Sequence, residues 1–524
     1  MTHWLDSQRR GVCRSWLRVP ARHPTATGDE KAPAPRPAPY RDRRCRACLI
    51  FAVLMVISSA LPGAVFASEV SDQTFFYVKP PAADFPSPTN LTEAQRQDTE
   101  FFRHYLDLNL TFTPAARAEA QRRIEQLGTK AGTLSPAQFE LAVAQIVALA
   151  RNGHSQILDL GVQPNGQRYR RFPFFALLFS DGLCVTRAMT VAQDLIGTCI
   201  TAIDGVPTAK ILSRFRASYG GIDEHFGSSA SFYYAQLPDF LYAAGIARRP
   251  DRALISYRAL DGRTGSLQVD AVATETIPKP AGFFSVMLPI TPAEAAAGWQ
   301  SLLHTEDRMP LYLKYPDQAF VRERLTKVQG FYIQLKINAN YQTNSIASFL
   351  DAAMAEIREV RPRFIVVDFR FNTGGVFETT GPAMKELPTL LPPDGRIYVI
   401  TNGTTFSAAI TSVNVLKQVG GDSTVIVGEP VGDRQRFWAE GAELCLPNSR
   451  ICIAYARGLH DYARGCDGES GCYETVEPTA VPLRVTSINP NIPVPSTFAD
   501  YTNRRDAALD AILSEESKRG ARNQ

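Results

Sequence analysis

The stretch from residue 331 to residue 427 most constrains the fold, because predicted strands and helices alternate along it. Four short apolar runs have the length and the β-branched or aromatic composition of strands: 331–337, 364–367, 397–401 and 424–427. A helix with an apolar stripe is predicted after Ser345, and another over 407–418. This alternation predicts an α/β core.

The chain before this core shows two different residue patterns, one typical of helices and one typical of strands. From about residue 92 to 152 the apolar residues follow a helical period, with starts predicted at Thr113-Pro114 and Ser135-Pro136. The helix that starts at Thr113-Pro114 is expected to bury one face, formed by Ala115, Ala118, Ile124 and Leu127. We expect a helical domain over 68–165.

From about residue 168 to 272 the pattern changes to strands and turns. Asp204-Gly205 and Asp261-Gly262 are typical turn dipeptides between short strands. The Pro- and Ala-rich segment 277–282 indicates a linker. We therefore expect a β-rich module over 166–276 and the α/β core over 277–524.

Residues 1–67 are expected to be an export leader. An apolar run from Leu49 to Leu61 follows the basic segment 41–46 and exits through small residues to Ala67. This order is typical of a secretory signal, with cleavage predicted after Ala67. The run is shorter than the roughly 20 residues that a membrane span needs. An uncleaved anchor is the alternative, and it would be the chain's only contact with a membrane.

The charge of the chain depends on that leader. The whole chain carries +4, but residues 1–67 hold 11 Lys and Arg against 4 Asp and Glu, or +7, which leaves −3 for the remainder. A slightly acidic exported part offers no basic patch for a nucleic-acid backbone. We expect no nucleic-acid partner, and no motif indicates a metal or another cofactor.

Six cysteines follow the leader, and export favours their oxidation. Proximity along the chain predicts three pairs: Cys184–Cys199, Cys445–Cys452 and Cys466–Cys472. Residues 446–451, inside the middle pair, are predicted to form a hairpin loop. Free buried thiols are the alternative. A zinc site is less favoured, because none of the spacings is CxxC.

Ser407 stands where the predicted strand 397–401 turns into a helix. A hydroxyl there lies near free backbone N–H groups at the positive end of a helix dipole. Such a place suits a nucleophilic serine and the oxyanion that follows its attack. A plain helix cap is the alternative.

Three motifs occur in order around Ser407. They are Asp368-Phe369-Arg370-Phe371-Asn372-Thr373-Gly374-Gly375, then Ser407-Ala408-Ala409, then Val427-Gly428-Glu429 with Gly432. In this order and spacing, over about 330–480, they resemble the tail-specific or C-terminal processing serine peptidases and their tricorn-like relatives. The upstream segments ending in Gly153-His154 and Asp204-Gly205 are also similar to parts of that family.

The resemblance implies a fold and an oxyanion hole. The fold is a ClpP/crotonase-like α/β peptidase core with an N-terminal helical domain and a PDZ-like module, although a plain β-rich spacer would also suit 166–276. The N–H of Gly374 or Gly375, with that of Ala408, would hold the oxyanion. Asp368 and Arg370 are expected to tie loops together, and Asn372 to hold the turn.

The resemblance offers two bases for the serine. In the processing peptidases a lysine follows the serine by a couple of dozen residues, where this chain has Gly432-Asp433-Arg434. Between Ser407 and Lys518 the only lysine is Lys417, inside the predicted helix, and arginine does not deprotonate in proteins. The tricorn-like branch uses a histidine from the helical segment, which points to His154. His460, in a possible exposed loop, is the competing base.

A third group orients the histidine in such sites. The resemblance implies Glu474, with Glu477 as the alternative, and Ser155 as a possible bridge between that glutamate and His154. Thr479 stands where the family has an aspartate, and Gly153 cannot act as a bridge.

Taken together, these residues predict an exported, periplasmic or extracellular serine-type endopeptidase. It would cleave proteins or peptides through an acyl-enzyme, with Ser407, His154 and Glu474 as the catalytic residues. The alternative is a catalytically inactive peptide- or lipid-binding protein on the same scaffold.

Overall fold

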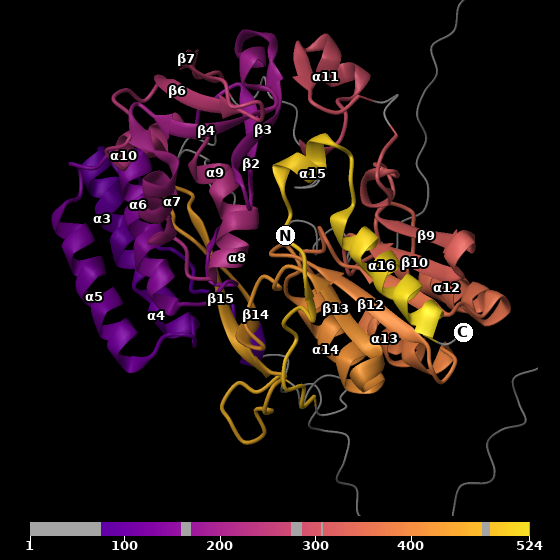
Figure 1. Cartoon of the computed structure of the whole chain (residues 1–524). Coiled ribbons are helices and arrows are strands. Elements are labelled where there is room, and N and C mark those ends of the chain that lie inside the picture. Colours follow the sequence, from indigo (N-terminus) through magenta and orange to yellow (C-terminus); the bar gives the residue numbers. More distant parts are fainter. Residues whose placement is uncertain (1–74, 159–168, 274–285, 305–307, 474–482, 523–524) are drawn as a thin grey trace, which may run out of the picture. The chain divides into compact units, whose positions relative to one another are not determined.

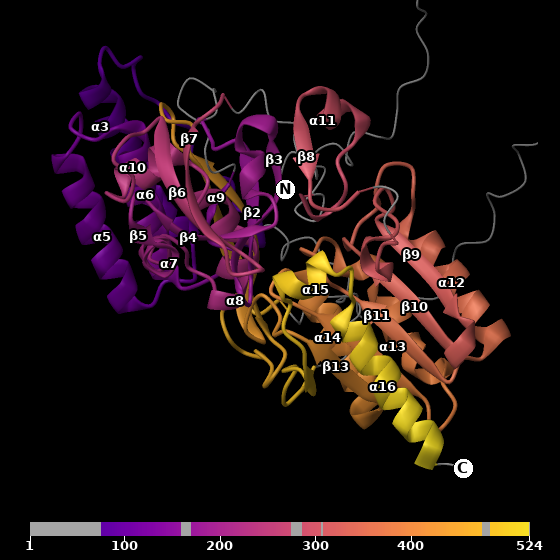
Figure 2. The same cartoon turned by 45° about the horizontal axis from the view of Figure 1, so that its top comes forward.

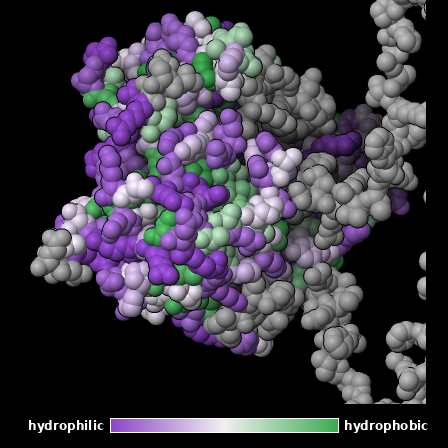
Figure 3. All heavy atoms as spheres, turned by 90° about the vertical axis from the view of Figure 1, so that its right-hand side faces the viewer, coloured by the Kyte–Doolittle hydropathy of each residue, from purple (hydrophilic) through white to green (hydrophobic). Residues whose placement is uncertain are grey.

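A computed structural model describes residues 75–158, 169–273, 286–304, 308–473 and 483–522 (Figure 1). No helix in these ranges is long and apolar enough to cross a membrane. The face drawn in Figure 3 is mainly hydrophilic, with hydrophobic side chains in small scattered groups. The expected leader and the linker expected at 277–282 lie outside the described residues.

A six-stranded sheet forms the α/β core, in the order β16-β13-β12-β11-β10-β9. Its strands are β9 (Phe320–Leu325), β10 (Gly330–Leu335), β11 (Phe364–Asp368), β12 (Arg396–Thr401), β13 (Thr424–Gly428) and β16 (Ile492–Pro493). The strands from β10 to β16 are parallel, and β9 is antiparallel to β10. The four strands predicted from apolar runs are confirmed, with ends that differ by one or two residues.

Helices pack on both faces of this sheet (Figures 1 and 2). The helices α12 (Ile346–Val360), α13 (Gly381–Glu386) and α14 (Ala408–Gly420) share one core with Ile365 and Val367 of β11. The C-terminal helix α16 (Ala507–Arg522) packs against Phe364 and Val366. Successive strand residues point to opposite faces, so both faces of β11 are apolar and buried.

The N-terminal helices are α3 (Leu91–Phe102), α4 (His104–Leu108), α5 (Pro114–Thr129) and α6 (Pro136–Val147). Thr113 and Ser135 cap α5 and α6, each with proline at the first helical position, as predicted. On α5 the predicted face is wrong in part. Ile124 and Leu127 are buried, but Ala115 and Ala118 are exposed, because the buried stripe continues through Ala120.

These helices share a core with a hairpin from the other end of the chain. The strands β14 (Arg436–Cys445) and β15 (Cys452–Asp461) are antiparallel, and β1 (Ile157–Leu158) pairs with β15 to make a three-stranded sheet. Leu444 and Ile453 of the hairpin pack with Ile124 and with Val143 of α6. The helical segment and the C-terminal hairpin therefore stabilise each other, and this contact brings residues near 154 close to residues near 433.

A seven-stranded antiparallel sheet follows the order β2-β3-β4-β6-β7, with β5 beside β4 and β8 beside β3. Its strands are β2 (Phe174–Phe179), β3 (Gly182–Met189), β4 (Thr198–Ile203), β5 (Val206–Pro207), β6 (Arg252–Ala259), β7 (Thr264–Asp270) and β8 (Trp299–Ser301). Asp204 and Gly205 form the predicted turn, with φ of 48° and 82°. The short helices α7 (Thr208–Arg216), α8 (Asp223–His225), α9 (Ser231–Tyr234) and α10 (Pro238–Ala243) follow β5, whereas α11 (Pro292–Ala296) and α15 (Phe498–Thr502) occur later in the chain.

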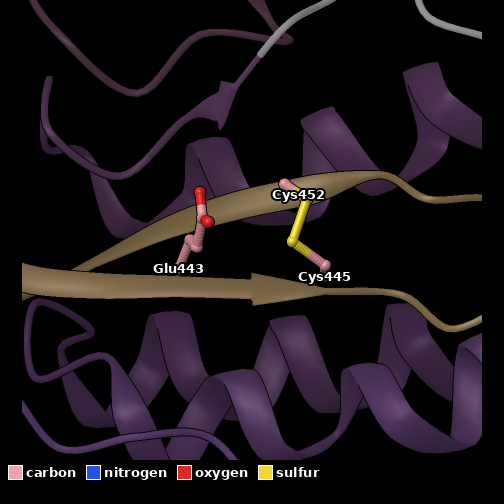
Figure 4. Close-up of side chains that lie close together, drawn as sticks. All are labelled: Glu443, Cys445 and Cys452. Carbon is pink, nitrogen blue, oxygen red and sulfur yellow. A yellow bond between two sulfur atoms is a disulfide. The ribbon is translucent and has the colours of Figure 1, made fainter. Parts of the chain in front are cut away.

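All three predicted disulfides are present. Cys184–Cys199 joins β3 to β4, Cys445–Cys452 closes the β14–β15 hairpin, and Cys466–Cys472 closes the loop after β15. Glu443 lies beside the middle pair (Figure 4). Because both sulfurs are bonded to each other, that cluster has no thiolate to offer a metal ion.

Candidate active site

Ser407 lies in a sharp turn between β12 and α14. Its φ of 54° and ψ of −128° are unusual for a residue with a side chain. The turn is held from outside, since the Phe406 N–H donates to the Asn372 carbonyl at 3.0 Å and the Gly432 N–H donates to the Thr405 carbonyl at 2.8 Å. Ser407 makes no capping hydrogen bond to α14. Ser407 occupies the N-cap position of α14, but its hydroxyl does not cap the helix, and the partly exposed side chain is left for another use.

The glycine loop lies directly against Ser407. A Cβ atom on Gly374, whose φ is +101°, would be 2.5 Å from the Ser407 Cβ and 3.1 Å from the Ala408 nitrogen. The Gly374 N–H donates to Asn372 Oδ1 at 3.0 Å. Within the described ranges, the N–H groups of Gly375 and Ala408 donate to no protein acceptor. Of the two glycines, Gly375 is thus the one with an N–H available for an oxyanion.

Two buried amides hold this loop in place. Asn372 donates to the Leu335 carbonyl at 2.9 Å and to Asn338 Oδ1 at 2.7 Å. Asn338 in turn donates to Ser412 Oγ at 3.1 Å and to the Ala408 carbonyl at 3.2 Å, both in α14. The expected role of Asn372 in holding the turn is confirmed, and the network reaches further, from β10 to α14.

Asp368 and Arg370 tie loops together, as predicted. The Arg370 guanidinium donates to Asp368 at 2.6 Å and to both carboxylate oxygens of Asp506 at 2.9 Å, and all three residues are buried. It also lies 4.3 Å over the ring of Tyr312. Because Asp506 immediately precedes α16, this cluster fastens the C-terminal helix to the end of β11.

His154 lies between two phenylalanine rings. It follows the 3₁₀ helix η1 (Ala148–Ala150), and its ring centroid is 4.3 Å from that of Phe406 and 5.4 Å from that of Phe437. The side chain is 17% exposed, and neither ring nitrogen has a hydrogen-bond partner among the described residues. Phe406 directly precedes Ser407, so the stack brings the predicted base beside the turn that carries the predicted nucleophile.

The stack continues on both sides of His154. His225, at the end of α8, stacks on the Phe406 ring, and the two ring centroids are 4.0 Å apart. His460, on β15, stacks on Phe437 at 4.8 Å. Three histidines and two phenylalanines thus alternate in one row, and they come from the helical region, the segment with the seven-stranded sheet, the α/β core and the C-terminal hairpin.

The structure does not support His460 as the competing base. It lies on β15 and is only 4% exposed, so the exposed-loop interpretation is wrong. Its Nδ1 contacts the Tyr462 hydroxyl at 2.8 Å, and its Nε2 contacts Glu440 Oε1 at 3.1 Å. Both ring nitrogens are therefore occupied, and the Phe437 ring stands between His460 and His154.

Asp433 is a site residue that sequence reasoning missed. Its side chain is 1% exposed, and its Oδ2 lies 3.9 Å from His154 Nδ1. Oδ1 accepts the Arg434 N–H at 2.9 Å, whereas Oδ2 has no hydrogen-bond partner in the described part of the chain. The available signal was its position, since it stands in the segment where the processing peptidases have their lysine.

Burial sets the protonation states of this pair. It lowers the pKa of His154 to about 3, with smaller contributions from His460 and His225. It raises the pKa of Asp433 to about 6, although the nearby Arg434 counteracts the shift. At neutral pH the imidazole is neutral and the carboxyl group is charged, which is the state a general base and its carboxylate partner require.

Of the remaining predicted site residues, some lie outside the described part of the chain and others lie within it. Glu474 and Glu477 lie outside the described residues. Ser155 is buried and accepts hydrogen bonds from Asn109 at 3.1 Å and Asn152 at 3.2 Å, so its hydroxyl belongs to a network on the helical side. A Cβ atom on Gly153 would lie 2.9 Å from the Phe406 ring and 3.0 Å from Asp433 Oδ2, which explains why glycine precedes His154.

No protein-family model matches this sequence, and no curated protein matches it. Among solved structures, a mutant of CPAF aligns with a TM-score of 0.51 and 12% identity, over 81% of this chain and 96% of that chain. The photosystem II D1 C-terminal processing protease aligns with a TM-score of 0.31 and 13% identity, over 76% of this chain and 93% of that one. The tricorn protease gives 0.33 and 13%, over 81% of this chain and 37% of that one.

The likeness to CPAF concerns the fold, because the identity is low. It confirms the expected architecture, an α/β core with an N-terminal helical region. The fold of this chain is similar to that of CPAF.

Proposed function

We propose that this protein is a serine-type endopeptidase. The observation that carries the proposal is Ser407, whose backbone is held at a positive φ, whose hydroxyl makes no capping hydrogen bond, and which lies against a glycine loop with an unused N–H. A conformation of that kind persists only where the surroundings enforce it, and such strain concentrates at functional sites.

We propose the following chemistry for these groups. Ser407 Oγ attacks a peptide carbonyl while His154 accepts its proton. The N–H groups of Gly375 and Ala408 stabilise the oxyanion of the tetrahedral intermediate. His154 then gives the proton to the leaving amine, which leaves an acyl group on Ser407, and water releases the acid by the same steps. The resemblance assigns the third position to Glu474, or alternatively to Glu477.

Three disulfides indicate that the protein works in an oxidising, exported environment. With the leader predicted at 1–67, we assign it to the periplasm or the extracellular space. The substrate is a protein or a peptide. We also propose that the 166–276 module is PDZ-like and binds an extended peptide segment at a sheet edge.

An active-site phosphonate probe tests the proposal. The protein should become labelled, and Ser407→Ala should abolish both labelling and peptide hydrolysis. Ser423→Ala, which removes a hydroxyl at the other end of α14, should leave both intact. His154→Ala should also abolish hydrolysis.

The alternative, a catalytically inactive peptide- or lipid-binding protein, makes a different prediction. A folded protein that stays unlabelled across the pH range in which histidine titrates would support it and would refute the peptidase proposal.

A further inference from the structure

Two aromatic rings fix part of the orientation of the His154 side chain. Phe406 and Phe437 lie on its two faces with interplanar angles of 24° and 12°. Such a sandwich fixes the plane of the imidazole. It does not decide which ring nitrogen lies towards Asp433, because a flipped ring fills the same slot. A group at the rim of the ring must make that choice.

Asp433 is the charged group at that rim. Its Oδ2 lies 3.9 Å from Nδ1 of His154, and both atoms are buried without another hydrogen-bond partner among the described residues. A movement of about 1 Å would bring them to the 2.7–2.9 Å of a charge-assisted hydrogen bond. Catalytic hydrogen bonds are often long before substrate binds.

The cost of burying Asp433 supports the same role. An ionised carboxylate with an unpaired oxygen is expensive to keep away from water. Arg434 relieves only Oδ1, through its N–H at 2.9 Å and its guanidinium at 3.7 Å. His154 Nδ1 lies 3.9 Å from Oδ2 and has no hydrogen-bond partner among the described residues, and the backbone N–H of Gly153 also favours the ionised carboxyl group.

We propose that Asp433 is the positioning residue for His154, and that it holds the Nδ1–H tautomer so that Nε2 is free to take the Ser407 proton. This inference rests on the proposed peptidase function. It gives Asp433 the orienting role that the resemblance assigned to Glu474. When Nε2 gains the proton, the imidazolium and the Asp433 carboxylate form an ion pair inside the protein, and this pair stabilises the charge that the reaction creates.

Kinetics provide the first test. Asp433→Asn should lower kcat about 100-fold or more with KM within about threefold, because the amide favours the wrong tautomer. Asp433→Glu should recover part of kcat. Glu440→Gln is the matched control, since it makes the same carboxylate-to-amide change beside His460, the neighbouring histidine of the stack, and should leave kcat within about threefold. Glu474→Gln tests the rival assignment.

A pH profile separates positioning from a general structural effect. The groups near the His154 imidazole are Asp433, Arg434, His225 and His460. Asp433→Asn should change the acid limb of the kcat/KM profile, whereas Glu440→Gln should preserve it. If Asp433→Asn keeps wild-type kcat and acid limb while Glu474→Gln loses kcat, the positioning role belongs to Glu474 and the inference is wrong.

Histidine NMR tests the inference without any enzymatic activity. Only five histidines follow residue 67, so ¹⁵N-labelled imidazoles can be assigned by single substitutions. His154 should show a protonated Nδ1 with a strongly downfield proton, which is lost in Asp433→Asn and kept in Glu440→Gln. A wild-type His154 protonated on Nε2, or an Nδ1–H signal that survives in Asp433→Asn, overturns the inference.

The two proposals fail in different ways. Absence of phosphonate labelling with a normal Nδ1–H signal would refute the peptidase and keep the Asp433–His154 contact. Labelling at Ser407 with no such signal would keep the peptidase and refute the positioning role of Asp433.

Discussion

Replacing Asn372 by alanine should damage both the stability and the activity of this protein. The side chain is fully buried and makes three hydrogen bonds: 2.9 Å to the Leu335 carbonyl, 2.7 Å to Asn338 Oδ1 and 3.0 Å from the Gly374 N–H. A hydrogen bond contributes about 1 kcal/mol net, so Asn372→Ala should reduce the free energy of unfolding by about 3 kcal/mol, and by more if the abandoned groups stay dry. With an unfolding entropy of about 2.1 cal/mol/K per residue, this corresponds to a Tm lower by about 3 °C for roughly 450 residues.

The effect on turnover should be larger than the effect on stability. Asn372 anchors the loop that places the Gly375 N–H, and loss of one oxyanion donor costs about 10²–10³ in kcat. Scanning calorimetry measures the first effect, and hydrolysis of a peptide substrate at saturating concentration measures the second. Asn372→Asp should keep the Gly374 contact but set one carboxylate oxygen, in the place of Nδ2, against both the Leu335 and the Asn338 oxygen, so it should be no better than alanine.

Asn414→Ala is the matched control for this experiment. Asn414 is as buried as Asn372 and lies on α14; it donates to the Ile410 carbonyl at 2.9 Å and accepts from Gln435 at 3.0 Å, but has no hydrogen bond to the glycine loop among the described residues. It should lower the free energy of unfolding by about 2 kcal/mol and leave kcat unchanged. If Asn372→Ala retains kcat within about threefold of Asn414→Ala, the loop does not depend on the amide and the reasoning is refuted.

Three further predictions follow from buried contacts. Gly153→Ala places a methyl group 2.9 Å from the Phe406 ring and should lower kcat at least tenfold in steady-state kinetics. Gly128→Ala, where the nearest atom is 3.6 Å away, should leave kcat unchanged. Equal values of kcat for the two variants would contradict the packing argument. Asp506→Asn removes one of the two buried carboxylates that pair with Arg370 and should lower the free energy of unfolding by about 3–5 kcal/mol, measured by urea denaturation. A loss below about 1 kcal/mol would contradict the predicted role of this ion pair. Burial raises the pKa of Asp433 from 3.8 to about 6, so its contribution to stability is present at low pH and is lost as pH rises through 6. Asp433→Asn should therefore match wild type below about pH 4 and be more stable by about 3 kcal/mol above pH 6; unfolding curves in which the variant is the less stable protein at pH 7 would reverse the sign and reject the argument.

Local patterns in the sequence predicted the features that depend on near neighbours. Ser135 and Ser345 are found as helix caps because capping needs only a side chain and the N–H groups two or three residues later. The three disulfides join cysteines 6, 7 and 15 positions apart, within hairpins and loops that turn signals already indicated. The strand before Ser407 was visible as an apolar run.

Other expectations failed where distant segments decide the outcome. The β14–β15 hairpin packs on α5 and decides which face of that helix is buried. The helical periodicity of the sequence alone therefore predicted wrongly that Ala115 and Ala118 are buried. The residues around His460 are compatible with an exposed loop, but His460 lies on β15, which pairs with both β1 and β14. Neither contact has a trace in the neighbouring residues of the sequence.

The sequence by itself determined that a serine stands between a buried strand and a helix, and that no lysine is placed to serve as its base. Only the tertiary structure decided that the Ser407 hydroxyl is not used to cap α14, because the turn is held by the hydrogen bond from the Phe406 N–H to the Asn372 carbonyl, in the loop after β11. It also decided that His154 lies near Asp433, since the hairpin that follows Asp433 packs on the helices that precede His154. Long-range packing sets which side chains meet, and local sequence does not encode it.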